Sequence, residues 1–349
     1  MGSILGMAST HWPLLIPPDE GHPWPFQMVM ERLPNFPEHL KNPINWPEEA
    51  RVEFAEDDGV AAHQKHRERL VKSFRVMKAE IEAFNPDFIL MFGDDQYENF
   101  REDIIPPFCV MAYDEFVSYP FRNGLIPGVN VWGEDKDHPI KMRGNPAVAR
   151  WLTKRLIEES VDMAYSYKPL HWDGLGHAFV NIQMFLDYDR KGLDVPVIPI
   201  SVNCYGSKVI RNHGGLPRDT DAPPDPSSPT PKRCFEVGQK VAKILKDSPY
   251  KVVIYASGGW SHGFLVEKNN FLWPDIESDR LRLNQLQEGM EEEWKNIPVS
   301  DIEDSGQQEF LNWVCLAGAM HEMGQKADVL DYLETHIFNS GKCLAVYRP

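Results

Sequence analysis

The chain has 349 residues, of which 42% are hydrophobic and 25% are charged, the composition of a globular protein with enough apolar material for a large core. Its formal net charge of −16 argues against a nucleic-acid binder, which needs a basic surface to neutralise phosphates. No apolar run approaches the roughly 20 residues that cross a bilayer, and the N-terminus lacks the regions of a signal peptide, so we expect no membrane partner.

Helix and strand patterns alternate from the N-terminus onward. The segment GSILGMAST, which ends at Thr10, predicts a strand that enters a polar turn. Residues 21–58 are rich in proline, tryptophan and charge and predict an irregular excursion. Residues 60–84 space apolar side chains at helical intervals, and Asn85-Pro86 ends that predicted helix because a residue before proline avoids the α region. The run DFILMF then predicts a buried strand.

The same alternation continues to the C-terminal third. Helices are predicted in NPAVARWLTKRLIEES and PKRCFEVGQKVAKILKD, and strands in VPVIPISV and YKVVIYAS. Helices of this length between short apolar strands predict an α/β fold with a mainly parallel or mixed central sheet flanked by helices. Residues 214–232 predict a proline-rich surface insert, and residues 280–338 have a mostly helical pattern. No linker is apparent, so we expect a single catalytic domain over residues 1–349.

The five cysteines are scattered, odd in number and free of CxxC spacing. We expect them to be reduced, mostly buried thiols in a cytoplasmic protein rather than ligands of a structural zinc. The apolar segment FLNWVCLAGAM in the helical tail either covers a subunit interface or packs on its own domain, and the sequence leaves both open.

Unusual polar residues follow four of the predicted strands, where open α/β sheets bind their ligands. The segments are ASTHWP with His11, GDDQYENF with Asp94, Asp95 and Glu98, HWDGLGHAF with His171, Asp173 and His177, and ASGGWSHGF with His262, followed by WPDIESD. Each of these segments also has a purely structural explanation. A lone histidine is more often structural, an aspartate can cap a turn or helix, and Asp275 and Glu277 could form the solvent face of a helix. Their joint placement favours one shared site.

Two chemistries fit these residues. GWSHG, residues 259–263, matches the G-x-S-x-G elbow of α/β-hydrolases with Ser261 as nucleophile, but Asn-Asn and Trp-Pro stand where the helix of that elbow should run. The other is a mononuclear metal site, because an imidazole and two oxygen donors on separate loops suit Fe(II) and leave positions for substrate and oxygen. A further histidine could then serve as acid or base near neutral pH.

These segments, taken in order, resemble the class III extradiol ring-cleavage dioxygenases, in particular the catalytic beta subunit of protocatechuate 4,5-dioxygenase. The resemblance rests on ASTHWP, GDDQYENFREDIIPPFCV, DVPVIPISVN, RCFEVGQKV, YASGGWSHGF and NWVCLAGAM…CLAVYRP. It implies a non-haem Fe(II) dioxygenase that opens a catechol-, gallate- or aminophenol-type ring with O2. It also implies a homodimer or a small helical partner subunit.

The resemblance assigns roles to individual residues. His11 matches the first iron-binding histidine, and Glu277 resembles the carboxylate ligand. His177 falls at the position of the acid/base histidine, and His262 matches a histidine that lines the pocket.

The family's second iron-binding histidine is absent from this chain. Aligned from the strand, Asp95 takes its place, and aligned from Phe100, Gln96 does. Asp95 is the expected ligand because a carboxylate is a hard, anionic donor. His63 or His66 could instead supply an imidazole from the preceding helix.

The altered ligand set keeps a second class of function open, a Zn(II) or Mn(II) hydrolase or a ligand-binding protein on the same fold. The aromatic residues expected to form pocket walls are Trp172, Tyr205 and Trp260.

Overall fold

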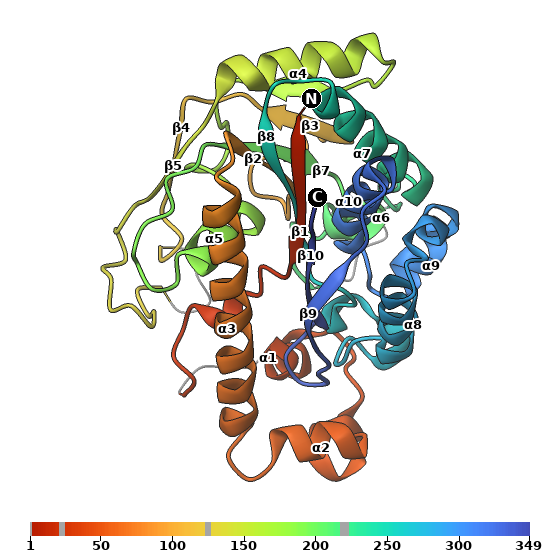
Figure 1. Ribbon diagram of the computed structural model, residues 1–349. Coiled ribbons are helices and arrows are strands. Elements are labelled where there is room, and N and C mark those ends of the chain that lie inside the picture. Colours follow the sequence, from red (N-terminus) through yellow and green to blue (C-terminus); the bar gives the residue numbers. More distant parts are fainter. Residues whose placement is uncertain (1, 21–24, 123–126, 217–222) are drawn as a thin grey trace.

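The computed structural model describes residues 2–20, 25–122, 127–216 and 223–349 and contains an eight-stranded sheet with helices on both faces (Figure 1). The strand order is β6-β3-β7-β2-β8-β1-β10-β9. The strands are β1 (Ser3–Ser9), β2 (Phe88–Asp94), β3 (Phe108–Met111), β6 (Ala164–Ser166), β7 (Val197–Val202), β8 (Lys251–Ser257), β9 (Asp328–Leu333) and β10 (Lys342–Tyr347). Strands β4 (Glu115–Ser118) and β5 (Ile140–Arg143) pair separately.

The centre of the sheet is parallel, because β7, β2, β8 and β1 pair side by side in the same direction. Strand β3 runs antiparallel to β7, and β10 runs antiparallel to β1, so the sheet as a whole is mixed. The predicted α/β fold with a mainly parallel or mixed sheet is therefore confirmed.

Each face of the sheet carries its own hydrophobic layer. Alternate residues of a strand point to opposite faces, so Phe88, Leu90 and Phe92 join one layer, whereas Ile89 and Met91 join the other. The first layer packs under α4 (Pro146–Glu158), α7 (Pro231–Lys246) and α10 (Phe310–Met323), and the second packs under α3 (Val60–Phe84) and α5 (His177–Leu186) (Figure 1). The remaining α-helices of the described residues are α1 (Pro25–Arg32), α2 (Glu48–Phe54), α6 (Gly206–Val209), α8 (Ile276–Gln287) and α9 (Val299–Asp304).

Helices α7 and α10 approach so closely that backbone meets backbone. A Cβ on Gly238 would lie 1.8 Å from the carbonyl oxygen of Cys315, and one on Gly318 would lie 2.0 Å from that of Phe235. All residues from Phe310 to Met320 are buried. The segment FLNWVCLAGAM therefore packs within its own chain, which is the second of the two alternatives that the sequence left open.

Several regions differ from the predictions. The expected irregular excursion contains α1 and α2, and strands β3 to β6 and helix α5 were not predicted. The helical pattern of 280–338 ends with α10, and β9 follows it as an edge strand of the sheet. In the predicted insert, residues 217–222 lie outside the described residues, and helix α7 already begins at Pro231. No helix in the described part of the chain is long and apolar enough to cross a membrane.

Candidate metal centre

The parallel order β2-β8-β1 brings three carboxyl strand ends to one edge of the sheet. Asp94 is the last residue of β2, and His11 lies just beyond the end of β1. Glu309 joins them from the residue that precedes α10. One ligand atom from each of these buried side chains lies within 4.8 Å of the other two. Among the described residues, no other group of three or more His, Cys, Asp or Glu side chains lies close enough together to hold a metal ion.

The hydrogen bonds of His11 determine which ring nitrogen faces this group. The Ser257 hydroxyl donates its single proton to the carbonyl oxygen of Ala178 at 2.5 Å. It can therefore only accept from Nδ1 of His11, which lies 3.0 Å away. In its neutral form the imidazole therefore carries the proton on Nδ1, and the lone pair of Nε2 points toward Glu309, 3.4 Å away. Such a fixed tautomer is typical of a metal-binding histidine.

Asp94 carries one oxygen that the protein leaves unsatisfied. Its Oδ1 accepts a hydrogen bond from Nδ2 of Asn312 at 3.1 Å, whereas its buried Oδ2 has no partner among the described residues. Burial, together with the charge of Glu309, raises the pKa of Asp94 to about 6. A buried carboxylate oxygen without a partner is costly, and a bound cation would satisfy it. The donor set therefore fits a divalent metal.

Glu309 is held by several donors. Its Oε2 accepts the backbone N–H of Gly259 at 2.7 Å, and its Oε1 lies 3.1 Å from Nε2 of His262 and accepts from the hydroxyl of Tyr205. Burial alone would raise the pKa of Glu309, but the imidazolium of His262 lowers it well below its usual value. Glu309 is therefore an ionised carboxylate in a fixed orientation.

His262 faces Glu309 as an imidazolium. Its Nδ1 donates to the carbonyl oxygen of Trp260 at 2.8 Å, so Nε2 needs a second proton to bind Glu309. Burial opposes that charge, but Glu309 raises the pKa of His262 above its usual value. A Cβ on Gly259 would lie 2.7 Å from the imidazole ring, so glycine is required there.

Asp95, the expected ligand, accepts hydrogen bonds from the backbone of the turn after β2. Its Oδ1 accepts the backbone N–H groups of Glu98 and Phe100 at 3.0 and 3.2 Å, and its Oδ2 accepts that of Asn99 at 2.8 Å. The carboxylate is thus used to fold the turn that follows β2, and it lies outside the three-residue group. The three-residue group thus contains Asp94 and not the expected Asp95, because the side chain at the strand end points to the neighbouring strand ends while the next one closes the turn.

The folded turn holds the N-terminus of α5. Glu98 accepts the backbone N–H and the ring Nδ1 of His177, and Asn99 bonds the backbone of Gly174 and Gly176. His177 thereby lies edge-on to His11, with 4.9 Å between ring centroids. Burial alone would lower the pKa of His177, but Glu98 raises it to about 10.

The other expected ligands lie elsewhere. Glu277 is exposed on the first turn of α8, and Asp275 caps that helix by accepting the backbone N–H of Ser278. His63 is buried under Trp12, where its Nδ1 lies 2.6 Å from Asp19. Neither belongs to the three-residue group, so both expectations are corrected. Gln96 lines the cavity and donates to the carbonyl of Gly214 instead.

The expected aromatic walls and the serine nucleophile are also corrected. Trp260 is fully buried against Phe310 and Trp313, and neither Trp172 nor Tyr205 lines the cavity, although Tyr205 bonds Glu309. Ser261 is buried and donates its hydroxyl proton to the carbonyl of Ser305, so it cannot attack a substrate.

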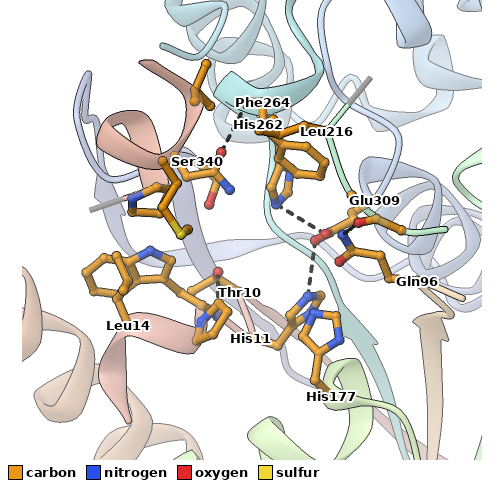
Figure 2. Close-up of a pocket in the computed structure, with 18 of the residues that line it drawn as sticks. Thr10, His11, Leu14, Gln96, His177, Leu216, His262, Phe264, Glu309 and Ser340 are labelled. Carbon is orange, nitrogen blue, oxygen red and sulfur yellow. Dashed lines mark hydrogen bonds and ion pairs between the residues drawn. The ribbon is translucent and has the colours of Figure 1, made fainter. Parts of the chain in front are cut away.

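A cavity of about 330 Å³ is lined by His11 and Glu309 of this group (Figure 2). His11, His177, His262, Gln96 and Glu309 line its inner end, and the hydroxyl-bearing Thr10 and Ser340 lie beside them. The rest of the wall is largely apolar: Trp12, Pro13, Leu14, Pro25, Met28, Val29, Leu216 and Phe264. A cavity of this size and polarity suits a small, mostly apolar ligand with a few polar atoms at one end.

Sequence reasoning missed Glu309 and the role of Glu98. Glu309 stands directly before the apolar run FLNWVCLAGAM. A carboxylate next to the start of a predicted helix was the one sequence pattern that could have drawn attention to it. Glu98 was noted as part of an acidic cluster, but no pattern linked it to His177.

Comparison with known proteins shows which family this chain resembles. Residues 226–342 match the family model described as the catalytic LigB subunit of aromatic ring-opening dioxygenase. The chain resembles the class III extradiol dioxygenases, as predicted. The matched residues include His262 and Glu309, whereas His11, Asp94 and His177 lie before the matched segment.

Curated relatives of the LigB-like chain carry dioxygenase names. It is 28% identical over 189 residues to the 2,3-dihydroxyphenylpropionate/2,3-dihydroxicinnamic acid 1,2-dioxygenase 2 of Pseudomonas putida, covering 54% of this chain and 47% of that protein. It is 26% identical over 191 residues to the like-named enzyme of Comamonas testosteroni, covering 55% and 48%. The chain thus spans about half the length of the curated relatives it matches. The structure of an uncharacterized protein from Escherichia coli K12 is similar with a TM-score of 0.47 at 13% identity, covering 80% of this chain and 92% of that one.

Proposed function

We propose that this protein is a non-haem Fe(II)-dependent extradiol dioxygenase that opens the ring of a catechol-type substrate with O2. The observation that carries the proposal is the His11–Asp94–Glu309 group, with its unsatisfied Asp94 oxygen; two of its members, His11 and Glu309, line a largely apolar cavity. The resemblance to LigB-type proteins supports the same chemistry.

The metal would be held by Nε2 of His11, Oδ2 of Asp94 and the carboxylate of Glu309. Bound there, Fe(II) supplies a Lewis acid and a template that brings vicinal hydroxyls and oxygen together. One imidazole and two carboxylates neutralise a divalent charge, and the imidazolium of His262 offsets part of the negative charge of Glu309.

The chain's own residues would bind the ring and handle protons. His177 lines the cavity next to His11 and is our candidate acid/base residue, with Glu98 fixing its Nδ1 so that Nε2 is the nitrogen free to exchange a proton with a substrate hydroxyl. His262 would serve as a catalytic cation beside Glu309. The apolar wall would exclude water from the ring.

A second candidate is a Zn(II) or Mn(II) hydrolase or binding protein on the same fold. The two carboxylates favour it, because oxygen donors suit Mn(II) better than they suit softer metals. Elemental analysis of protein purified without added metal separates the two: stoichiometric zinc without oxygen uptake supports the second candidate.

A cytoplasmic location remains part of the proposal. All five cysteines are free and buried, which suits a reducing compartment. Whether the chain is a homodimer or binds a small helical partner stays a prediction.

The test of the proposed function is turnover with defined metal. Protein loaded anaerobically with Fe(II) should consume O2 with catechols, gallates or aminophenols and form yellow ring-opened products. His11→Ala should lose both metal and activity, whereas His171→Ala, which removes an imidazole bonded to Asp103 outside the cavity, should retain both. Iron-loaded protein that is inactive on every compound would contradict the proposal.

A further inference from the structure

The segment that follows His11 forms one wall of the cavity. Trp12, Pro13 and Leu14 all line the cavity, and Leu14 is labelled on that wall in Figure 2. We call these three residues the 12–14 wall. His11 itself has a separate support, because Nδ2 of Asn181 donates to its carbonyl oxygen at 3.0 Å. The contacts that hold the metal-binding histidine are thus distinct from those that hold the wall.

The backbone of residues 12–18 is poor in hydrogen-bond donors. Pro13, Pro17 and Pro18 have no N–H group. Three carbonyl oxygens of the segment accept backbone N–H groups, namely those of Trp12, Pro13 and Ile16, from Leu15, Ile16 and Val131 respectively. The carbonyl oxygens of Leu14, Leu15 and Pro17 accept no backbone N–H of the described residues, and all three residues are buried. Buried carbonyl oxygens need donors, so a side chain has to supply them.

Arg67, on helix α3, is that side chain. Its Nη2 donates to the carbonyl oxygens of Leu14 and Pro17 at 3.3 and 2.5 Å, and its Nη1 donates to the carbonyl oxygen of Leu15 at 2.7 Å. One guanidinium thus satisfies the carbonyl oxygens that the segment leaves open, and it ties the residues directly behind the 12–14 wall to a 25-residue helix.

The other contacts of Arg67 fix the guanidinium itself. Its Nε donates to Oδ1 of Asp19 at 2.7 Å, and its Nη1 also donates to the hydroxyl of Tyr188 at 3.1 Å. A guanidinium has five N–H groups in a rigid plane, and each of them has an acceptor here. The side chain is 13% exposed, so water has little access to replace these bonds. A lysine ammonium, with three donors, cannot serve the same acceptors.

We propose that Arg67 is a positioning residue that holds the 12–14 wall where the substrate ring packs against it. This inference rests on the proposed function for the identity of the ring. Arg67 does not line the cavity, so it acts through the backbone of the segment and not by touching the substrate. Loss of the planar donors lets the wall move and loosens its contact with the ring, whereas His11 keeps its own supports.

The test uses Arg67→Lys, which keeps the charge but not the planar set of donors. Hydrogen exchange of the amides of Leu15 and Ile16 and equilibrium binding of catechol are measured on Fe(II)-loaded protein without oxygen. We expect the two amides to exchange at least about tenfold faster and catechol to bind roughly three- to tenfold more weakly. Fe(II) affinity should change by less than about twofold. A purely structural role would lower the midpoint of denaturation without changing catechol binding.

Arg69→Lys is the matched control. Arg69 lies on the same helix, but its guanidinium binds Asp331 on β9 and does not contact the 12–18 segment. It should leave both measurements unchanged. Tyr188→Phe, which removes one acceptor of Arg67, is the milder second variant and should speed the same amides by about threefold. The inference is overturned if the wild type binds no catechol, if Arg67→Lys binds catechol as tightly as the wild type, or if Arg69→Lys has the same effects.

Admitting oxygen separates this inference from the proposed function. If Arg67→Lys weakens catechol binding but the wild type forms no ring-opened product, the dioxygenase proposal fails and the positioning role stands. If the wild type opens catechol and Arg67→Lys binds it without loss, the reverse holds.

Discussion

Glu98 accepts the backbone N–H and the ring Nδ1 of His177, each at 3.0 Å. The two residues come from different elements, the turn after β2 and the first residue of α5. The carboxylate therefore satisfies a free helix N–H and fixes the imidazole orientation at once. Glu98 itself does not line the cavity, so it acts through His177 as a positioning residue.

Removing the charge of Glu98 should impair proton transfer more than substrate binding. For Glu98→Gln we expect kcat to fall by roughly 10- to 100-fold with KM changed less than about threefold, because His177 loses its fixed orientation. Glu102→Gln is the control, since Glu102 is exposed and bonds the Tyr97 hydroxyl outside the cavity. A similar loss in both variants, or a change confined to KM, would contradict a positioning role.

The metal content of two neighbouring variants tests the assignment of the ligand. Asp94→Ala should weaken Fe(II) binding by at least about 100-fold, because it removes the donor that has no protein partner on Oδ2. Asp95→Ala should keep near-stoichiometric metal but lose about 1–2 kcal/mol of unfolding free energy, because three backbone N–H groups of the turn lose their acceptor. Metal analysis and chemical denaturation measure the two effects. The opposite pattern would return the ligand role to Asp95.

The raised pKa of Asp94 predicts how metal affinity depends on pH. Burial and Glu309 raise that pKa to about 6, so protons compete with the metal for the carboxylate as the pH falls through 6. Affinity should be nearly constant above pH 7 and fall by about tenfold per unit below pH 6. Competition titrations with a chelator between pH 5 and 8 provide the measurement. A flat profile down to pH 5 would show that Asp94 does not bind the metal.

A buried lysine predicts an unusual dependence of stability on pH. Nζ of Lys342 donates to the carbonyl of Ser340 at 2.7 Å and lies 4.2 Å from the ring centroid of Trp12. Burial lowers the pKa of Lys342 to about 7, although Glu53 and Asp279 oppose that shift. The unfolded chain, with the ordinary lysine value of 10.5, then binds more protons between pH 7 and 10.5, so this residue's contribution to stability rises with pH over that range.

Replacing Lys342 with methionine should therefore stabilise the protein at neutral pH. We expect Lys342→Met to gain about 1–2 kcal/mol at pH 7, after losing the bond to Ser340. The gain should be smaller at pH 9.5, because the folded lysine is then neutral and the free energy of removing the proton from the unfolded lysine, whose pKa is 10.5, is smaller there. Denaturation at the two pH values, with exposed Lys65→Met as the control, measures this difference. A larger gain at pH 9.5 than at pH 7 would contradict the lowered pKa.

The sequence by itself determined the core elements of this protein. Helix α3 spans residues 60–84, as its apolar spacing and the Asn85-Pro86 stop predicted, and β2, β7 and β8 coincide with short apolar runs. Periodicity is a local property, so it could be read without the fold. The positions of polar residues after predicted strands also indicated a shared site, and His11, His177 and His262 line one cavity in the structure.

Only the tertiary structure decided which carboxylates complete the group. Asp94 and Asp95 are adjacent and chemically alike in sequence, and the choice between them depends on where the chain leaves β2 and on which side chain accepts the N–H groups of the turn. Glu309 lies 215 positions after Asp94 and reaches the site because α10 packs against α7 with its N-terminus at the strand ends. Glu277 looked equivalent in sequence but points to solvent. Such long-range packing leaves no local periodicity in the chain, so side-chain chemistry alone could propose a metal centre but could not select its carboxylates.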